Sequence, residues 1–96
     1  MLEHAEIVHE PDNGRFALMV KGNLAGYADY AEGSDGVRDF NHTVVLDEYR
    51  GQGLSSPLIK AALDDSRDAG VKVKATCSAV EHFIAKNPEY AEQLAE

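Results

Sequence analysis

The chain has 96 residues, 44% of them hydrophobic, and 17 Asp and Glu against 9 Lys and Arg give a formal net charge of −8. This length fits one compact domain spanning 1–96 and is too short for two. The acidic balance, without any cluster of Lys or Arg, argues against a surface for nucleic acid or anionic membranes. A basic or amine-bearing partner remains compatible with it.

The N-terminal residues MLEHAEIVHE combine neither the basic start nor the apolar run of a signal peptide. No apolar run approaches the roughly 20 residues that a membrane-spanning helix needs. The single cysteine, Cys77, excludes an internal disulfide framework, and the four histidines show no metal-ligand spacing. We therefore expect a soluble, cytoplasmic protein without a metal site.

The first half of the chain reads as an antiparallel meander. Pro11–Gly14 is a turn signal, and Gly22-Asn23 is expected to form a hairpin turn. Apolar and β-branched runs between these turns predict strands over 5–10, 15–20 and 24–31.

The longest strand is predicted over 37–46, VRDFNHTVVL. Its expected core residues are Val37, Phe40, Val44 and Val45. Because the alternation of the side chains slips between Phe40 and Val44, a β-bulge is expected there.

From Leu54 onward the period changes to that of an amphipathic helix, with Leu54, Leu58, Ile59, Ala62 and Leu63 on one face. The helix is expected to end before Gly70. Alternation over 71–77 predicts a half-buried strand. A capping box, Ser78 with Glu81 three residues later, predicts a helix to about residue 86, and Pro88 permits a short final helix over 88–96. The predicted class is α/β, a mostly antiparallel mixed sheet followed by a loop, helix, strand and helix.

Two close glycines, Gly51 and Gly53, lie between the longest strand and the first helix. Backbone N–H groups at such a helix start can converge on an anion. The loop is not a Walker motif, and it lacks the third glycine of a dinucleotide fingerprint. The pattern alone is more typical of a tight turn.

The surrounding residues favour the anion site. Arg50-x-x-Gly53-x-Ser55 resembles the Gln/Arg-x-x-Gly-x-Gly/Ala signature of the GNAT superfamily of N-acetyltransferases, in the same place between strand and helix. The segment 41–90 further resembles a small YjdJ-type subgroup, in which a His-Thr pair precedes the loop and a cysteine precedes a tail similar to FIAKNPEY.

The resemblance implies a minimal GNAT-like fold that binds acetyl-CoA as cosubstrate. The loop amides of Gln52 to Ser56 would bind the pyrophosphate, with Arg50 beside them, and a backbone N–H near Val44 to Leu46 would receive the thioester carbonyl. The strands over 37–46 and 71–77 would splay apart to admit the pantetheine arm. The expected coenzyme-binding residues are Val45, Leu46, Arg50, Gly51, Gln52, Gly53, Leu54, Ser55 and Ser56.

For catalysis the resemblance selects Cys77, either as a nucleophile that accepts the acetyl group or as a proton donor to the leaving thiolate. Its phase with Val71 and Val73 is equally typical of an inert core thiol. His42 could accept the proton of the amine, or simply face solvent or Asp39.

The acceptor is an amine of unknown identity. Only Pro11–Gly14 separates the first two strands, where larger members of the superfamily carry helices, so the acceptor side should be shallow and open. That suits a protein tail or a small polyamine. The alternative function is a non-catalytic acyl-CoA-binding or protein-interaction module with the same fold.

Overall fold

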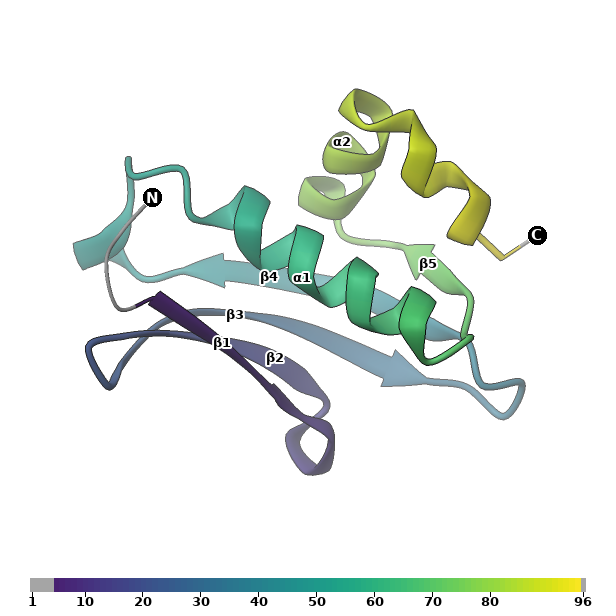
Figure 1. Ribbon diagram of the computed structural model, residues 1–96, viewed down its shortest axis with the longest axis horizontal. Helices are drawn as coiled ribbons and strands as arrows, with labels where there is room; N and C mark the ends of the chain where they lie inside the picture. The colour runs from purple at the N-terminus through teal and green to yellow at the C-terminus, as the bar shows by residue number, and fades with distance from the viewer. Residues whose placement is uncertain (1–4, 96) are drawn as a thin grey trace.

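The computed structural model describes residues 5–95 and contains one five-stranded sheet in the order β1-β2-β3-β4-β5. Strands β1 to β4 form the antiparallel meander, and β5 pairs with β4 in parallel, so the predicted α/β class and mixed sheet are confirmed (Figure 1). The elements are β1 Ala5–Glu10, the 3-10 helix η1 Pro11–Asn13, β2 Arg15–Val20, β3 Asn23–Glu32, β4 Arg38–Val45, the 3-10 helix η2 Asp47–Tyr49, α1 Ser55–Asp68, β5 Val73–Ala75, α2 Ser78–Lys86 and the 3-10 helix η3 Pro88–Gln93.

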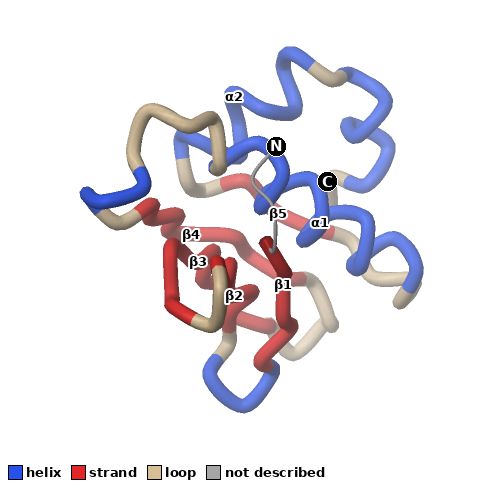
Figure 2. The backbone as a smooth tube through the Cα atoms, turned by 60° about the vertical axis from the view of Figure 1, so that its left-hand side comes forward, coloured by secondary structure: helices blue, strands red, loops and turns tan. Residues whose placement is uncertain are grey.

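Helices α1 and α2 lie on the same side of the sheet (Figure 2). The opposite side, which we call the open face, carries no helix in the described part of the chain. Strand register places four of its side chains in one row across β1 to β4, and Val8 in that row is 36% exposed. The row consists of Val8, Ala17, Tyr27 and Val44.

The core lies between the helices and the sheet. The five apolar residues predicted for the helix face are all buried, at 0 to 5% exposure. They belong to one buried cluster with residues on one face of β2, β3 and β4, among them Phe16, Leu18 and Phe40. Gly70 follows the helix with φ of 75°, as expected of a residue that ends a helix in the left-handed region.

A charged residue occupies the core position that was predicted for Val37. Arg38 is buried, whereas Val37 is only half-buried and lies outside the core. The Arg38 guanidinium donates to Asp65 and Ser66 of α1, at 3.1 Å each, and lies over the Tyr30 ring. The hydrogen bonds and the aromatic face offset the cost of removing this cation from water.

The predicted bulge is present, and its extra residue is Asn41. Asp29 pairs with His42, yet the next residue of β3, Tyr30, pairs with Phe40. Because strand faces alternate with a period of two, the extra residue reverses the phase of the rest of β4. Val45 therefore packs against the core together with Phe40, and Val44 lies on the open face, so the prediction that Val44 is a core residue was wrong.

Several boundaries differ from the predictions. The hairpin turn is Lys21-Gly22, because these two residues have positive φ (51° and 81°) as a type I′ turn requires, and Asn23 already belongs to β3. The strand predicted over 71–77 is limited to Val73–Ala75.

Helix α2 begins at Ser78, but its N-cap is Cys77 and no side chain caps it, so the predicted capping box does not form. The final helix is a 3-10 helix that ends at Gln93. Leu94 and Ala95 instead run beside β5, where the Ala95 N–H donates to the Val73 carbonyl, and residue 96 lies outside the described residues.

Candidate functional site

Strands β4 and β5 separate after three paired residues, as predicted for a splayed sheet. Their register ends at Phe40 opposite Ala75, and one further bond joins the Cys77 N–H to the Phe40 carbonyl at 2.9 Å. Beyond this point β4 continues to Val45, while the chain after β5 turns into α2. The second half of β4 therefore has a free edge beside the start of α2.

The bulge decides which backbone groups face this edge. The Leu46 N–H donates to Ala25 of β3 at 2.8 Å, so it is not available for a ligand. Alternation then directs the N–H and C=O of Val45 toward the free edge. In agreement, the Val45 carbonyl accepts a bond from the Arg50 side chain, which lies outside the sheet.

The start of α1 is left without a cap. Its N-cap residue is Leu54, which has no side-chain acceptor, and the first turn contains no acidic residue. Within residues 5–95, no hydrogen bond is formed by the N–H groups from Gly51 to Ser56. Unsatisfied N–H groups and the positive end of a helix together favour an anion at this position.

The two loop glycines give this turn its shape. Gly51 and Gly53 have φ of 83° and 69°, in the left-handed region that other residues rarely adopt. A Cβ atom added at either glycine would meet nothing within 4 Å, so the space next to both glycines is open in the described chain. The residues present therefore fit a phosphate group, which could approach the backbone closely.

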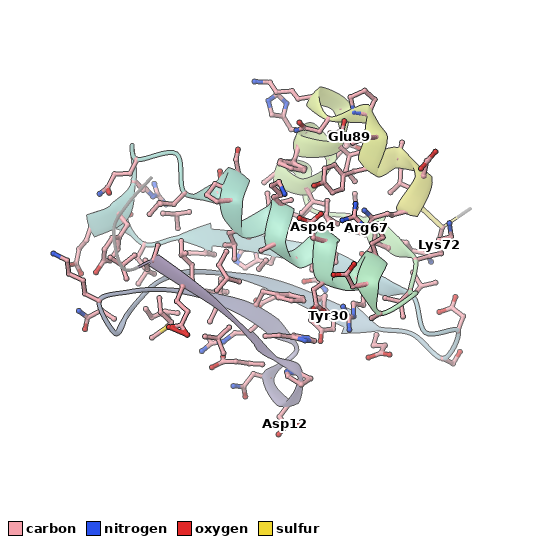
Figure 3. The ribbon with its side chains drawn as sticks, viewed as in Figure 1. Asp12, Tyr30, Asp64, Arg67, Lys72 and Glu89 are labelled. Carbon is pink, nitrogen blue, oxygen red and sulfur yellow. The ribbon has the colours of Figure 1, made fainter. Side chains whose placement is uncertain are left out.

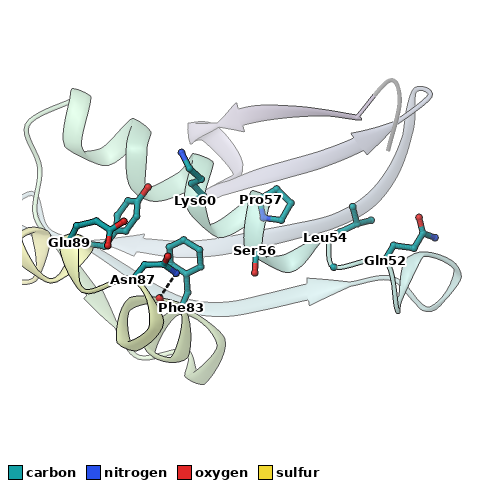
Figure 4. Close-up of a pocket in the computed structure, with 10 residues that line it drawn as sticks. Gln52, Leu54, Ser56, Pro57, Lys60, Phe83, Asn87 and Glu89 are labelled. Carbon is teal, nitrogen blue, oxygen red and sulfur yellow. Dashed lines mark hydrogen bonds between the residues drawn. The ribbon is translucent and has the colours of Figure 1, made fainter. Parts of the chain in front are cut away.

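A pocket of about 410 Å³ opens beside the loop, between the first turns of α1 and the end of α2 with η3 (Figure 4). Four of the predicted coenzyme residues line it: Gln52, Gly53, Leu54 and Ser56. Six further residues line it that the sequence reasoning did not assign to the coenzyme site: Pro57, Lys60, Phe83, Asn87, Glu89 and Tyr90. Only Tyr90, an amphipathic ring near the chain end, carried a usable signal in the sequence.

The remaining predicted coenzyme residues do not line this pocket; they are Val45, Leu46, Arg50, Gly51 and Ser55. Arg50 is largely exposed, and its Nε atom is bound to the Asp47 carboxylate at 3.2 Å and to the Val45 carbonyl at 3.3 Å. These bonds tie the loop to the end of β4. Ser55 and Gly51 contribute backbone N–H groups beside the pocket.

A polar cluster lies at one end of the pocket and consists of Lys60, Asp64 and Tyr90. Figure 3 shows Asp64 beside Arg67 on α1. Lys60 Nζ lies 2.8 Å from Asp64 Oδ2, and the Tyr90 hydroxyl donates to Asp64 Oδ1 at 2.9 Å. The bond to Asp64 raises the pKa of the Lys60 ammonium, which stays charged at neutral pH. Arg67 pairs with the same carboxylate at 3.2 Å.

Cys77 is half-buried at the N-terminus of α2. Its Sγ lies 3.5 Å from Thr43 Oγ1 on β4. Burial alone would raise the pKa of the thiol, but hydrogen bonds from the Thr43 side chain and from the backbone of Val80 and Ala79 outweigh it and lower the pKa. A lowered thiol pKa is typical of a reactive cysteine, and contact with the hydrophobic core, which Cys77 also makes, is typical of a structural thiol.

His42 and Cys77 are not brought together. The bulge directs Thr43 toward Cys77 and leaves its neighbour His42 exposed on the open face, with its ring 6.4 Å from that of Tyr27. The two side chains therefore lie on opposite faces of the sheet.

Two further features bear on the class of protein. Among residues 5–95, no group of three or more His, Cys, Asp or Glu side chains could hold a metal ion. In the same range, neither helix has both the length and the apolar character that are needed to cross a bilayer.

Comparisons with known proteins agree with this geometry. Protein NATD1 from Bos taurus and from Homo sapiens is 40% identical over 58 residues, which are 58% of this chain, and the chain spans about half (51%) of the length of these relatives. NATD1 from Danio rerio is 34% identical over 58 residues, covering 58% of this chain and 53% of its own length.

Solved structures share the whole fold. A GCN5-like protein from Staphylococcus aureus, determined in solution by NMR, superposes with a TM-score of 0.73 at 25% identity, covering 98% of this chain and 91% of its own. The structure of AAC(6')-Iy in complex with the bisubstrate analog CoA-S-monomethyl-acetylneamine has a similar fold, with a TM-score of 0.53 at 23% identity, covering 85% of this chain and 61% of its own. The model of GCN5-related N-acetyltransferases matches residues 15–94, which include the parted strands, the uncapped helix start and the thiol, and the chain belongs to this family.

Proposed function

We propose that the protein is an acetyl-CoA-dependent N-acetyltransferase of the small YjdJ-type subgroup, folded as one domain over 1–96 and acting in the cytoplasm. The observation that carries the proposal is the uncapped start of α1, where consecutive N–H groups border a pocket of about 410 Å³. Five N–H groups, from Gln52 to Ser56, would hold the pyrophosphate of the coenzyme.

The free edge of β4 would guide the pantetheine arm. The Val45 N–H faces this edge, and we propose that it donates a hydrogen bond to the carbonyl oxygen of the thioester. A fixed donor there stabilises the negative charge that develops on this oxygen during transfer. Leu46 cannot serve in this role, since its N–H already donates to Ala25. Phe83 and Tyr90, whose rings pack at 5.3 Å between centroids, would supply the apolar wall of the pocket.

Cys77 would act at the sulfur end of the arm. As a nucleophile, its thiolate would form a bond to the acetyl carbon while the bond from that carbon to the coenzyme sulfur breaks, and the amine would then displace the thiolate from acetyl-Cys77. As an acid, its thiol would give a proton to the departing coenzyme thiolate. The lowered pKa of Cys77 supports the nucleophilic role, because a thiolate is the reactive form.

His42 would act from the acceptor side. An amine must lose a proton to attack, and the exposed imidazole on the open face could accept it. In the part of the chain that the structure describes, this face carries no helix, and β1 and β2 are joined by only η1 and Gly14. An uncovered face on a chain with net charge −8 suits a cationic acceptor, either a protein tail or a small polyamine.

The test begins with a calorimetric titration of acetyl-CoA, followed by release of coenzyme thiol in the presence of polyamines and lysine-containing peptides. We expect saturable binding, turnover with at least one amine, and an added acetyl group on Cys77 by intact-mass spectrometry. Cys77→Ala and His42→Ala should bind the coenzyme as the wild type does and lose turnover. Wild-type turnover in both variants would refute the assigned roles, and an absence of binding would refute the proposal.

The open acceptor side also favours a second function, a non-catalytic acyl-CoA-binding or protein-interaction module. The β1–β2 connection is too short to shape a pocket that would hold an amine in place. Because precise placement of the reactants supplies much of the rate of a transfer reaction, such a site would favour binding over catalysis. Saturable binding with no transfer across the whole amine panel would select this function.

A further inference from the structure

The coenzyme pocket contains a single cation among the residues that line it, and this is Lys60. Its side chain extends from α1 at the end of the pocket away from Gln52, and Glu89 lies at the same end (Figure 4). Lys60 follows Ser56 by four residues, so it lies about 6 Å further along the helix than the loop amides.

We propose that Lys60 binds the 3′-phosphate of the coenzyme and makes the protein select coenzyme A over 3′-dephospho-coenzyme A. This inference rests on the proposed function. The ligand carries phosphate at two positions, as a pyrophosphate and as a 3′-phosphate on the ribose. The loop amides account for the first group only, and a dianion at the second position needs a cation.

Arg50 is less suited to this role because of its position. It does not line the pocket, and its side chain is directed toward Asp47 and the Val45 carbonyl. The pocket wall on the side of η3 offers the carboxylate of Glu89, which repels a phosphate. The charges of the pocket therefore direct the 3′-phosphate toward the α1 side.

Lys60 can turn to the ligand at small cost. Its ammonium pairs with Asp64 within one helix, at positions i and i+4, and the side chain is 61% exposed, so the pair contributes little to stability. Asp64 keeps two other partners when Lys60 leaves, the Tyr90 hydroxyl and Arg67. A phosphate dianion is a stronger acceptor for the ammonium than this shared carboxylate.

The experiment compares the dissociation constants of coenzyme A and 3′-dephospho-coenzyme A by calorimetry, for the wild type and for Lys60→Met. Methionine keeps the length and the helix propensity of lysine and removes its charge. A charged hydrogen bond to phosphate predicts that the wild type binds coenzyme A about tenfold more tightly than the dephospho form. In Lys60→Met the two affinities should become nearly equal, through weaker binding of coenzyme A alone.

Lys74→Met is the matched control, because it removes the same charge from an exposed residue of β5 that does not line the pocket. Lys74→Met should keep the wild-type ratio of the two dissociation constants. In both the wild type and this control, added salt should reduce the preference for coenzyme A over the dephospho form. Equal affinities in the wild type, or an unchanged ratio in Lys60→Met, would overturn the role of Lys60 and leave the proposed function standing. If neither ligand binds, both fail together.

Discussion

Replacing Gly53 with glutamate places a negative charge at the start of α1, where the pyrophosphate is proposed to bind. The cost to the fold can be estimated separately from the cost to binding. An added Cβ at Gly53 meets nothing within 4 Å, so the Cβ atom itself creates no clash. What remains is the left-handed backbone at φ of 69°, which costs a residue with a side chain about 1–2 kcal/mol.

The cost to binding is larger. A carboxylate about 5 Å from a phosphate, at an effective dielectric constant of about 20, costs about 3 kcal/mol per unit charge. That corresponds to a loss of about two orders of magnitude in coenzyme affinity. Gly53→Ala carries the backbone cost without the charge, so it should lose far less affinity than Gly53→Glu.

Gly36→Glu supplies the control for charge and backbone together. Gly36 lies in the loop between β3 and β4, away from the pocket, with φ of 79° and nothing within 4 Å of an added Cβ. Both glutamate variants should lower the melting temperature by a similar amount, roughly 4–8 °C for each kcal/mol in a domain of this size. Calorimetry should then show coenzyme binding in Gly36→Glu and almost none in Gly53→Glu. Equal binding by the two variants would refute the loop as the pyrophosphate site.

Three further substitutions test the thiol and the packing. Thr43→Val should move the pH profile of Cys77 alkylation by iodoacetamide to higher pH, because it removes a hydrogen bond that lowers the thiol pKa. Thr43→Ser keeps the hydroxyl and should leave the profile unchanged. Identical profiles for the wild type and Thr43→Val would contradict this. Gly26→Ala places a Cβ 2.6 Å from the Val44 carbonyl oxygen and should cost about 1–3 kcal/mol in urea unfolding, and a neutral result would show that β4 can yield. Leu58→Ala, at a position with 0% exposure, should cost about 2–5 kcal/mol in the same assay, and a loss below 1 kcal/mol would be inconsistent with this packing.

Local patterns in the sequence were sufficient for the order of the elements. The period of four from Leu54 to Leu63 marked the buried face of α1, and the slip after Phe40 marked the bulge. Both signals come from neighbouring residues, and local geometry produces both.

The features that the sequence did not predict depend on segments far apart in the chain. Arg38 enters the core because Asp65 and Ser66 of α1 meet it there, and no local pattern encodes that pairing. In the same way, four of the ten residues that line the pocket come from α2, η3 and the residue between them, about 30 residues or more beyond the glycine loop. The motif therefore located only the part of the pocket that we propose binds phosphate.

The bulge at Asn41 has a consequence for how the site could change. With the extra residue Asn41 present in β4, Thr43 and Val45 face the helices. Without it, His42 and Val44 would face the helices instead. A strand has only two faces, so no rotamer change or small hinge motion lies between these alternatives. The number of residues between Phe40 and Thr43 thus determines which side chains of β4 line the gap between β4 and β5. Substitutions at Asn41 would leave that count intact, and a deletion would exchange the two faces in one step.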